Sequence, residues 1–132
     1  ENSSALADAL AAHPAVARVH ALSRPDHPDR TLAASVLQGT CPLVAIEIGG
    51  PAERAEERAL RVVSRLRLAT HAASLGDVRT LVSLPSLTSH AAMTAEQRLA
   101  LGLRAGLMRI SAGIEDAADL VADFVEALDA AG

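Results

Sequence analysis

The stretch Gly106-Leu-Met-Arg-Ile-Ser-Ala-Gly-Ile-Glu-Asp-Ala-Ala-Asp-Leu120 reads as a short strand, a glycine turn and the start of a last helix. Successive side chains of a strand point to opposite faces of the sheet. Met108 and Ile110 are therefore expected on an apolar face. The opposite face is expected to carry Leu107, Arg109 and Ser111.

The turn that follows this strand has its own expected chemistry. Gly113 is expected to allow a backbone conformation that other residues resist. Glu115 and Asp116 are expected to place negative charge in the first helical turn, where the helix dipole favours it. Together with Asp119, they are interpreted as helix-start charge rather than as an acid–base pair.

Arg109 is the candidate functional residue of this stretch. A guanidinium on a rigid strand beside a turn can grip a carboxylate, because its planar fork donates two parallel hydrogen bonds. The alternative is a surface arginine on a half-exposed strand, since exposed charges are the norm. Spacing alone leaves both interpretations open.

The rest of the chain alternates short strands and helices. Asn2 or Ser3 is expected to cap a first helix that runs to about Ala12. Thr94 and Gln97 have the spacing of a capping box at another helix start. The other expected helices are 31–38, 52–66 and 114–130, and the expected strands are 16–20, 43–48, 67–73, 79–84 and 107–111.

Two of the expected helices have an apolar side. The inward residues of helix 52–66 are expected to be Ala55, Ala59, Val62, Val63 and Leu66. Those of helix 114–130 are expected to be Ile114, Ala117, Leu120, Val121, Phe124, Val125 and Leu128. This mixture of elements predicts an α/β domain, a small sheet with helices on one face.

Composition excludes several classes of function. The chain has 132 residues and is expected to form a single domain. Phe124 is its only aromatic residue and its net charge is −4, so nucleic-acid binding by base stacking or phosphate tracking is not expected. No apolar run has the length of a membrane span.

Few residues offer catalytic or metal chemistry. The five histidines show no paired ligand spacing, so no metal site is expected; they are His13, His20, His27, His71 and His90. Cys41 is the only cysteine, interpreted as a small buried hydrophobe, and its lack of a partner fits a reducing, cytoplasmic compartment. Ser74 and Ser89 are interpreted as turn residues, because neither lies in a nucleophile elbow.

Several segments, in order along nearly the whole chain, resemble the cysteine/methionine-metabolism family of pyridoxal-phosphate enzymes. This family comprises cystathionine lyases and synthases, methionine γ-lyase and homoserine sulfhydrylases. The segments are 11–20, His27-Pro28, 39–48, 64–68, 73–78, 84–91 and Leu107-Met-Arg-Ile-Ser-Ala-Gly-Ile-Glu-Asp116. The last is similar to a family pattern, Leu-Ile-Arg-Leu-Ser-Val-Gly-Ile-Glu.

The resemblance implies a fold and a site. The fold would be the small C-terminal domain of the aspartate-aminotransferase class (fold type I), with a short, mainly antiparallel sheet and helices on one face. Arg109 would bind the α-carboxylate of an amino-acid substrate, and Ser74 would lie beside it, acting largely through its backbone. The reaction would be β- or γ-elimination or replacement at a C–S bond.

The resemblance also implies partners. A large domain or chain would bind pyridoxal phosphate, and the whole enzyme would be a homodimer or homotetramer. The chain begins at Glu1 and has no lysine, so no side chain here can form a Schiff base, and the cofactor-binding domain is expected to be absent from it. The alternative is a free-standing, non-catalytic binding or assembly module derived from that domain.

Departures from the family pattern affect the reaction more than the family. Ala69 stands where the family often has an aromatic residue, and Leu84-Pro85 where it has His-Pro. Asp77 replaces a frequent second glycine. The amino acid that is the substrate, and whether elimination or replacement occurs, do not follow from the sequence.

Overall fold

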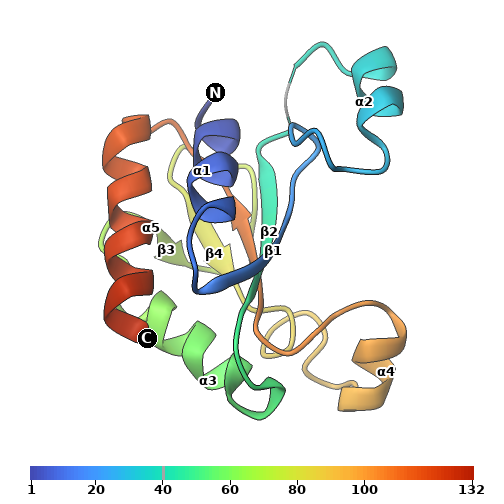
Figure 1. Ribbon diagram of the computed structural model, residues 1–132, viewed down its shortest axis with the longest axis vertical. Helices are drawn as coiled ribbons and strands as arrows, with labels where there is room; N and C mark the ends of the chain where they lie inside the picture. Colours follow the sequence, from blue (N-terminus) through green and yellow to red (C-terminus); the bar gives the residue numbers. More distant parts are fainter. Residues whose placement is uncertain (40) are drawn as a thin grey trace.

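The computed structural model describes residues 1–39 and 41–132 and has a five-stranded sheet at its centre (Figure 1). Thr40, in the predicted 39–48 segment, lies outside the described residues. The strand order is β1-β2-β5-β4-β3, and only the β3–β4 pair is parallel. The strands are β1 (Val16–His20), β2 (Leu43–Ile48), β3 (Thr70–His71), β4 (Leu81–Ser83) and β5 (Leu107–Ser111).

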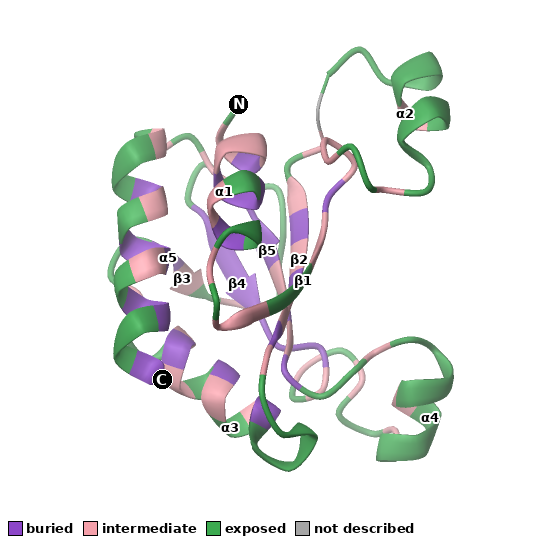
Figure 2. Cartoon of the chain, in the orientation of Figure 1, coloured by how far each residue is buried: buried purple, intermediate pink, exposed green. Residues whose placement is uncertain are grey.

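Three helices cover one face of this sheet (Figure 1). They are α1 (Asn2–Ala11), α3 (Ala52–Val63) and α5 (Ala117–Ala131). Two short helices, α2 (Arg30–Val36) and α4 (Ala95–Ala100), have no buried residue and stand away from the sheet (Figure 2). The predicted α/β architecture, a mainly antiparallel sheet with helices on one face, is confirmed.

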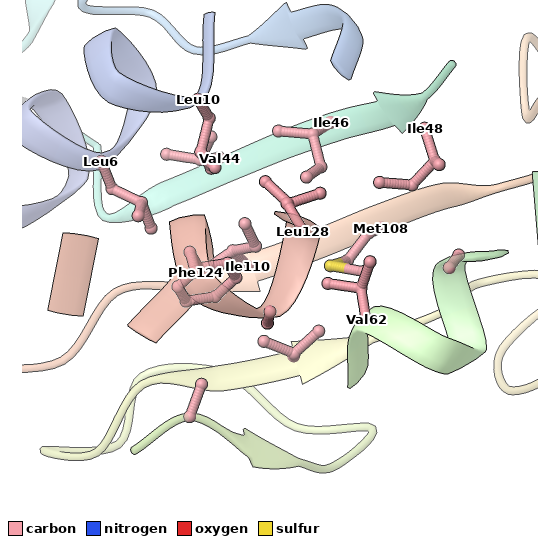
Figure 3. Close-up of a cluster of buried hydrophobic side chains, with 14 of the residues drawn as sticks. Leu6, Leu10, Val44, Ile46, Ile48, Val62, Met108, Ile110, Phe124 and Leu128 are labelled. Atoms are coloured by element: carbon pink, nitrogen blue, oxygen red, sulfur yellow. The ribbon is translucent and has the colours of Figure 1, made fainter. Parts of the chain in front are cut away.

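The core lies between the sheet and the three covering helices (Figure 3). Strands β2 and β5 contribute every second residue to it, as their alternation predicts. Phe124 of α5 is fully buried among these aliphatic side chains. The strand residues of this core are Val44, Ile46, Ile48, Val82, Met108 and Ile110.

Several helix and strand boundaries that were predicted from the local sequence are confirmed. The observed β1, β2 and β5 have the predicted bounds. The capping box at Thr94 is present: its side chain accepts from the Gln97 backbone N–H at 3.2 Å, and the Gln97 side chain accepts from the Thr94 N–H at 2.9 Å. Helix α3 ends three residues early, at Val63, and Leu66 packs against the core from beyond its end.

The predicted cap of α1 is wrong. Glu1 is the N-cap residue and makes no side-chain cap, and Asn2 is already helical. The Asn2 amide instead donates to the carbonyl oxygens of Gly113, at 3.1 Å, and Glu115, at 2.6 Å. A long-range contact therefore uses the side chain that local pattern assigned to the helix end.

The predicted start of the last helix is also wrong. Helix α5 begins at Ala117, and Asp116 caps it by accepting the backbone N–H groups of Ala118 and Asp119. Ile114, expected to be buried, is 80% exposed, and Val125 is half-buried. Glu115 precedes the helix and binds Thr80 instead of serving as helix-start charge.

Gly113 is required for a reason other than the predicted one. Its φ angle is not positive; the glycines with positive φ are Gly50, Gly76, Gly102 and Gly106. A Cβ at Gly113 would instead clash with the Val78 carbonyl oxygen and would meet the Thr80 nitrogen at 2.6 Å. Glycine therefore permits close approach of two backbone segments.

The predicted strand 67–73 is reduced to Thr70–His71. The backbone N–H groups of Arg67, Leu68 and Ala69 donate to the carboxylate of buried Asp123 instead of to a neighbouring strand. A backbone donor used in this way cannot also serve a sheet ladder. Within residues 1–39 and 41–132, no helix has the length and apolar character needed to cross a membrane.

Candidate functional site

The candidate site lies on the face of the sheet opposite α1, α3 and α5, called here the open face. Because Met108 and Ile110 point into the core, Arg109 and Ser111 point to the open face. Arg109 is paired with Ala45 of β2 on one side and Ser83 of β4 on the other. Both neighbours have short side chains, so the strands beside Arg109 do not crowd its guanidinium.

The structure brings the two predicted site residues together. A terminal nitrogen of Arg109 donates to the backbone carbonyl oxygen of Ser74 at 2.8 Å. Ser74 lies in the exposed segment between β3 and β4, 35 residues away in sequence. The Ser74 hydroxyl has no hydrogen bond among the described residues, so its contact with Arg109 is through the backbone alone.

The hydrogen-bonding capacity of Arg109 is only partly used. Its Nε atom is buried and has no hydrogen-bond partner within the described part of the chain. No aspartate or glutamate of residues 1–39 and 41–132 forms an ion pair with it. A buried donor without an acceptor costs about 1–3 kcal/mol, so this guanidinium keeps a donor that an added hydrogen-bond acceptor could satisfy.

Ser111 supplies a contact that sequence reasoning missed. Its hydroxyl accepts the backbone N–H of Gly76 at 3.0 Å, and the residue is 1% exposed. Arg109 and Ser111 therefore both hold the Ser74–Gly76 segment against the open face. The available signal was the i, i+2 spacing, which places both residues on one face of β5.

A second missed cluster holds the next part of the chain. The Glu115 carboxylate accepts both the backbone N–H and the hydroxyl of Thr80, the latter at 2.8 Å. The Thr80 oxygen in turn accepts the Gly113 N–H at 2.9 Å. Thr80 is fully buried, so this network fixes where the chain enters β4.

Another polar group lies on the open face toward β1. His20 and Glu47 are hydrogen-bonded at 2.9 Å, and Arg104 approaches the other Glu47 oxygen at 3.8 Å. Glu47 is thus already paired with basic side chains. A hollow of about 330 Å³ lies between α4 and the turn from β2 to α3, but neither Arg109 nor Ser74 lines it.

One carboxyl group at the site is electrostatically perturbed. The backbone N–H of Arg79 donates to Asp77 at 3.0 Å, and this bond holds the pKa of Asp77 below its ordinary value of 3.8. Asp77 is therefore ionised at neutral pH. Its negative charge pairs with the Arg79 guanidinium at 3.5 Å rather than with Arg109.

The other predicted candidates do not assemble into a site. Within the described chain, no three or more His, Cys, Asp or Glu side chains are grouped so as to hold a metal ion. The Ser89 hydroxyl is hydrogen-bonded to the ring of the neighbouring His90 at 2.8 Å, in an exposed contact. Cys41 is half-buried, not fully buried as expected.

A family model described as "Cys/Met metabolism PLP-dependent enzyme" matches residues 1–129. Among curated proteins, the chain is 40% identical to O-succinylhomoserine sulfhydrylase of Mycobacterium tuberculosis over 123 residues, which is 93% of this chain and 30% of that protein. It is 39% identical to cystathionine gamma-lyase of Bacillus subtilis, over 98% of this chain and 33% of that protein. The chain therefore spans about a third of the length of these relatives.

Solved structures agree with the sequence match. The chain superposes on cystathionine gamma synthase of Xanthomonas oryzae pv. oryzae, in complex with cystathionine, with a TM-score of 0.88 and 38% identity. The superposition covers 98% of this chain and 33% of that one. The resemblance found from the sequence is confirmed: the chain belongs to the Cys/Met-metabolism family of PLP-dependent enzymes.

The residues of this chain do not by themselves fit the family's cofactor. Pyridoxal phosphate is held by such enzymes through a lysine Schiff base, and all twelve basic Lys/Arg positions here are arginine.

Proposed function

We propose that this family member is the C-terminal, substrate-carboxylate-binding domain of a PLP-dependent sulfur amino acid lyase or transsulfuration enzyme. Residues 1–132 form one domain, and the cofactor is bound by a large domain or chain outside it. The observation that carries this proposal is the state of Arg109. It lies on the open face, hydrogen-bonded to Ser74, with a buried Nε that has no partner in the described chain.

Arg109 binds the α-carboxylate of the amino-acid substrate, and the Ser74 backbone orients the guanidinium. Two parallel N–H···O bonds to a carboxylate fix its plane as well as its position. Fixing the carboxylate also fixes the direction of the bonds at the substrate's Cα, and such positioning is worth several kcal/mol of barrier. This chain thus supplies orientation for β- or γ-elimination or replacement at a C–S bond.

The proposal includes the partners of the domain. The open face is covered by the cofactor-binding part, and the whole enzyme is a cytoplasmic homodimer or homotetramer. Exposed apolar residues beside the site support a covered face, since such patches are a liability in water. They are Leu75, Val78 and Ile114, which are 55%, 64% and 80% exposed.

The alternative is a non-catalytic binding or assembly module derived from this domain. The coding sequence upstream of Glu1 distinguishes the two. An in-frame, lysine-bearing domain supports the enzyme. A start codon immediately before Glu1 supports the module.

The test of the site is Arg109→Ala in the enzyme that contains this chain. Loss of charge-assisted hydrogen bonds worth about 2–4 kcal/mol raises KM about 30- to 1,000-fold while the cofactor stays bound. Arg67→Ala is the matched control, because the Arg67 side chain is 82% exposed and pairs with Glu126 of α5. An Arg109→Ala enzyme with unchanged substrate affinity contradicts the site assignment.

A further inference from the structure

We infer that Ser111 is a positioning residue of the candidate carboxylate site, because its hydroxyl holds the loop that carries Ser74. The loop is defined as residues 73–77, between β3 and β4. The inference depends on the proposed function for the identity of the site. The loop contacts that support the inference are observed in the structure and do not depend on that function.

Both ends of the loop are anchored by backbone pairing. Before it, the N–H groups of Thr70 and Ala72 donate to the carbonyls of Thr80 and Val82. After it, the Ile114 N–H donates to the Val78 carbonyl at 2.9 Å. These contacts fix the strands that flank the loop but none of its own residues.

The loop itself is attached by two side chains of β5. Among residues 1–39 and 41–132, hydrogen bonds from loop residues 73–77 to the body of the domain are those of Arg109 to the Ser74 carbonyl and of Gly76 to the Ser111 hydroxyl. Asp77 adds only a local bond to the Arg79 N–H. The loop residues are almost all exposed, so packing contributes little to holding them.

Substrate binding is expected to affect the Arg109–Ser74 hydrogen bond and the Ser111–Gly76 hydrogen bond differently. Arg109 is the proposed ligand of a carboxylate, and its guanidinium must adjust when that anion binds. Ser111 is 1% exposed and stays out of contact with any ligand. Its hydroxyl is therefore the attachment that persists through binding and keeps the Ser74 carbonyl within hydrogen-bond distance of the guanidinium.

A loop held in this way lowers the cost of binding. If the loop were free, the guanidinium would lose its fixed acceptor and would have to be ordered together with the loop when substrate binds. Ser111 thus acts through Gly76 and Ser74 on the orientation of Arg109. It touches neither substrate nor cofactor.

The first test is amide hydrogen exchange of this chain without any ligand. Ser111→Ala removes the acceptor of the Gly76 N–H, so exchange at Gly76 rises about two- to tenfold, the worth of one hydrogen bond. Ser111→Thr keeps the hydroxyl and restores protection. Ser35→Ala, which removes a serine hydroxyl bonded to the Leu32 carbonyl of distant α2, leaves Gly76 unchanged.

If the alanine variant does not fold, hydrogen exchange at Gly76 is measured in Ser111→Cys instead. The cysteine side chain is nearly isosteric with serine, but its sulfur is only a weak acceptor. Unchanged exchange at Gly76 in either variant, with the amides of β2 still protected, overturns the inference.

The second test uses the enzyme that contains this chain. Ser111→Ala raises KM about two- to tenfold with kcat little changed, because binding geometry rather than chemistry is affected. Faster Gly76 exchange with unchanged KM overturns the positioning role. An Arg109→Ala enzyme with normal KM overturns the proposed function but leaves the exchange result intact, so the two failures are distinguishable.

Discussion

The two faces of the sheet differ in how their side chains are satisfied. On the covered face, the side chains of β2 and β5 are apolar and pack against α1, α3 and α5. On the open face, the same two strands carry Glu47, Arg109 and Ser111. One strand, β5, therefore serves both purposes through the alternation of its residues.

The difference between the faces separates the residues that stabilise the fold from those of the candidate site. Burial of apolar area stabilises the covered face and requires nothing from outside the chain. The open face includes the buried Nε of Arg109, which has no hydrogen-bond partner in the described part of the chain and therefore costs free energy. Natural domains often carry such unfavourable features at functional sites. If the two faces differ in this way, substitutions on the covered face lower stability more than those on the open face.

The largest effect is expected on the covered face, at Phe124. This residue is fully buried and is the only aromatic side chain of the chain. Phe124→Ala leaves a large cavity between α5 and the sheet and lowers the free energy of unfolding by about 3–5 kcal/mol. Ile114→Ala, at an 80% exposed position, changes it by less than about 0.5 kcal/mol. Denaturant unfolding of both variants makes the comparison, and equal losses would contradict it.

The next effect is expected at Asp123, the one acidic residue of α5 whose carboxylate serves backbone donors of another segment. It accepts the N–H groups of Arg67, Leu68 and Ala69 at 2.8–3.4 Å. Asp123→Asn replaces an anionic acceptor by a neutral one and lowers the free energy of unfolding by about 1.5–3 kcal/mol. Glu126→Gln is the control, since its pair with Arg67 is exposed. A loss no larger than that of the control would show that the turn at residue 67 does not depend on this carboxylate.

Much of the covered face could be predicted from the sequence. The alternation in β2 and β5 is a local pattern, and the bounds of both strands followed from it. The helical period of α3 is also local and predicted the start of the helix, although the helix ends three residues earlier than predicted. The capping box at Thr94 is equally local. Such elements need no knowledge of what packs against them.

Long-range polar contacts could not be predicted in the same way. Asn2 and Glu115 have typical helix-end sequences, yet their side chains bind residues more than 30 positions away. Asp123 shortened a predicted strand by taking its N–H groups. Propensity carries no information on these partners, because they meet only after the chain has folded.

The candidate site was half predictable. Alternation placed Arg109 on the face away from the core, and resemblance to a family joined it to Ser74. The attachment of the loop by Ser111 required the register of β5 against β4, in which Ser111 lies opposite Leu81 and Arg109 opposite Ser83. Spacing within β5 alone does not give that register.

A smaller change in the free energy of unfolding is expected when Arg109 is substituted. Arg109→Met keeps an extended side chain and removes the buried Nε, which has no partner among the described residues, so the loss of the Ser74 bond is offset. The free energy of unfolding is expected to change by less than about 1 kcal/mol. Met108→Ala, one residue away on the covered face, lowers it by about 2–5 kcal/mol. Similar losses at both positions would show that the two faces contribute alike.

The smallest effect concerns two exposed carboxyl groups, one of them in the loop on the open face. The pKa of Asp77 is lowered mainly by the backbone N–H of Arg79, whereas that of Asp26 is lowered mainly by the Arg24 side chain, bonded at 3.0 Å. Arg24→Ala should therefore return the pKa of Asp26 toward its ordinary value. Arg79→Ala should leave the pKa of Asp77 still lowered, because the backbone donor remains.

Carboxyl-carbon NMR titration of the two variants measures this difference. Because the folded pKa of Asp77 lies below its unfolded value, its contribution to stability is present at neutral pH and is lost as pH falls through the folded pKa. A full return of the Asp77 pKa in Arg79→Ala would mean that the side chain, not the loop backbone, sets that charge. The loop would then be less ordered than its attachments to Arg109 and Ser111 require.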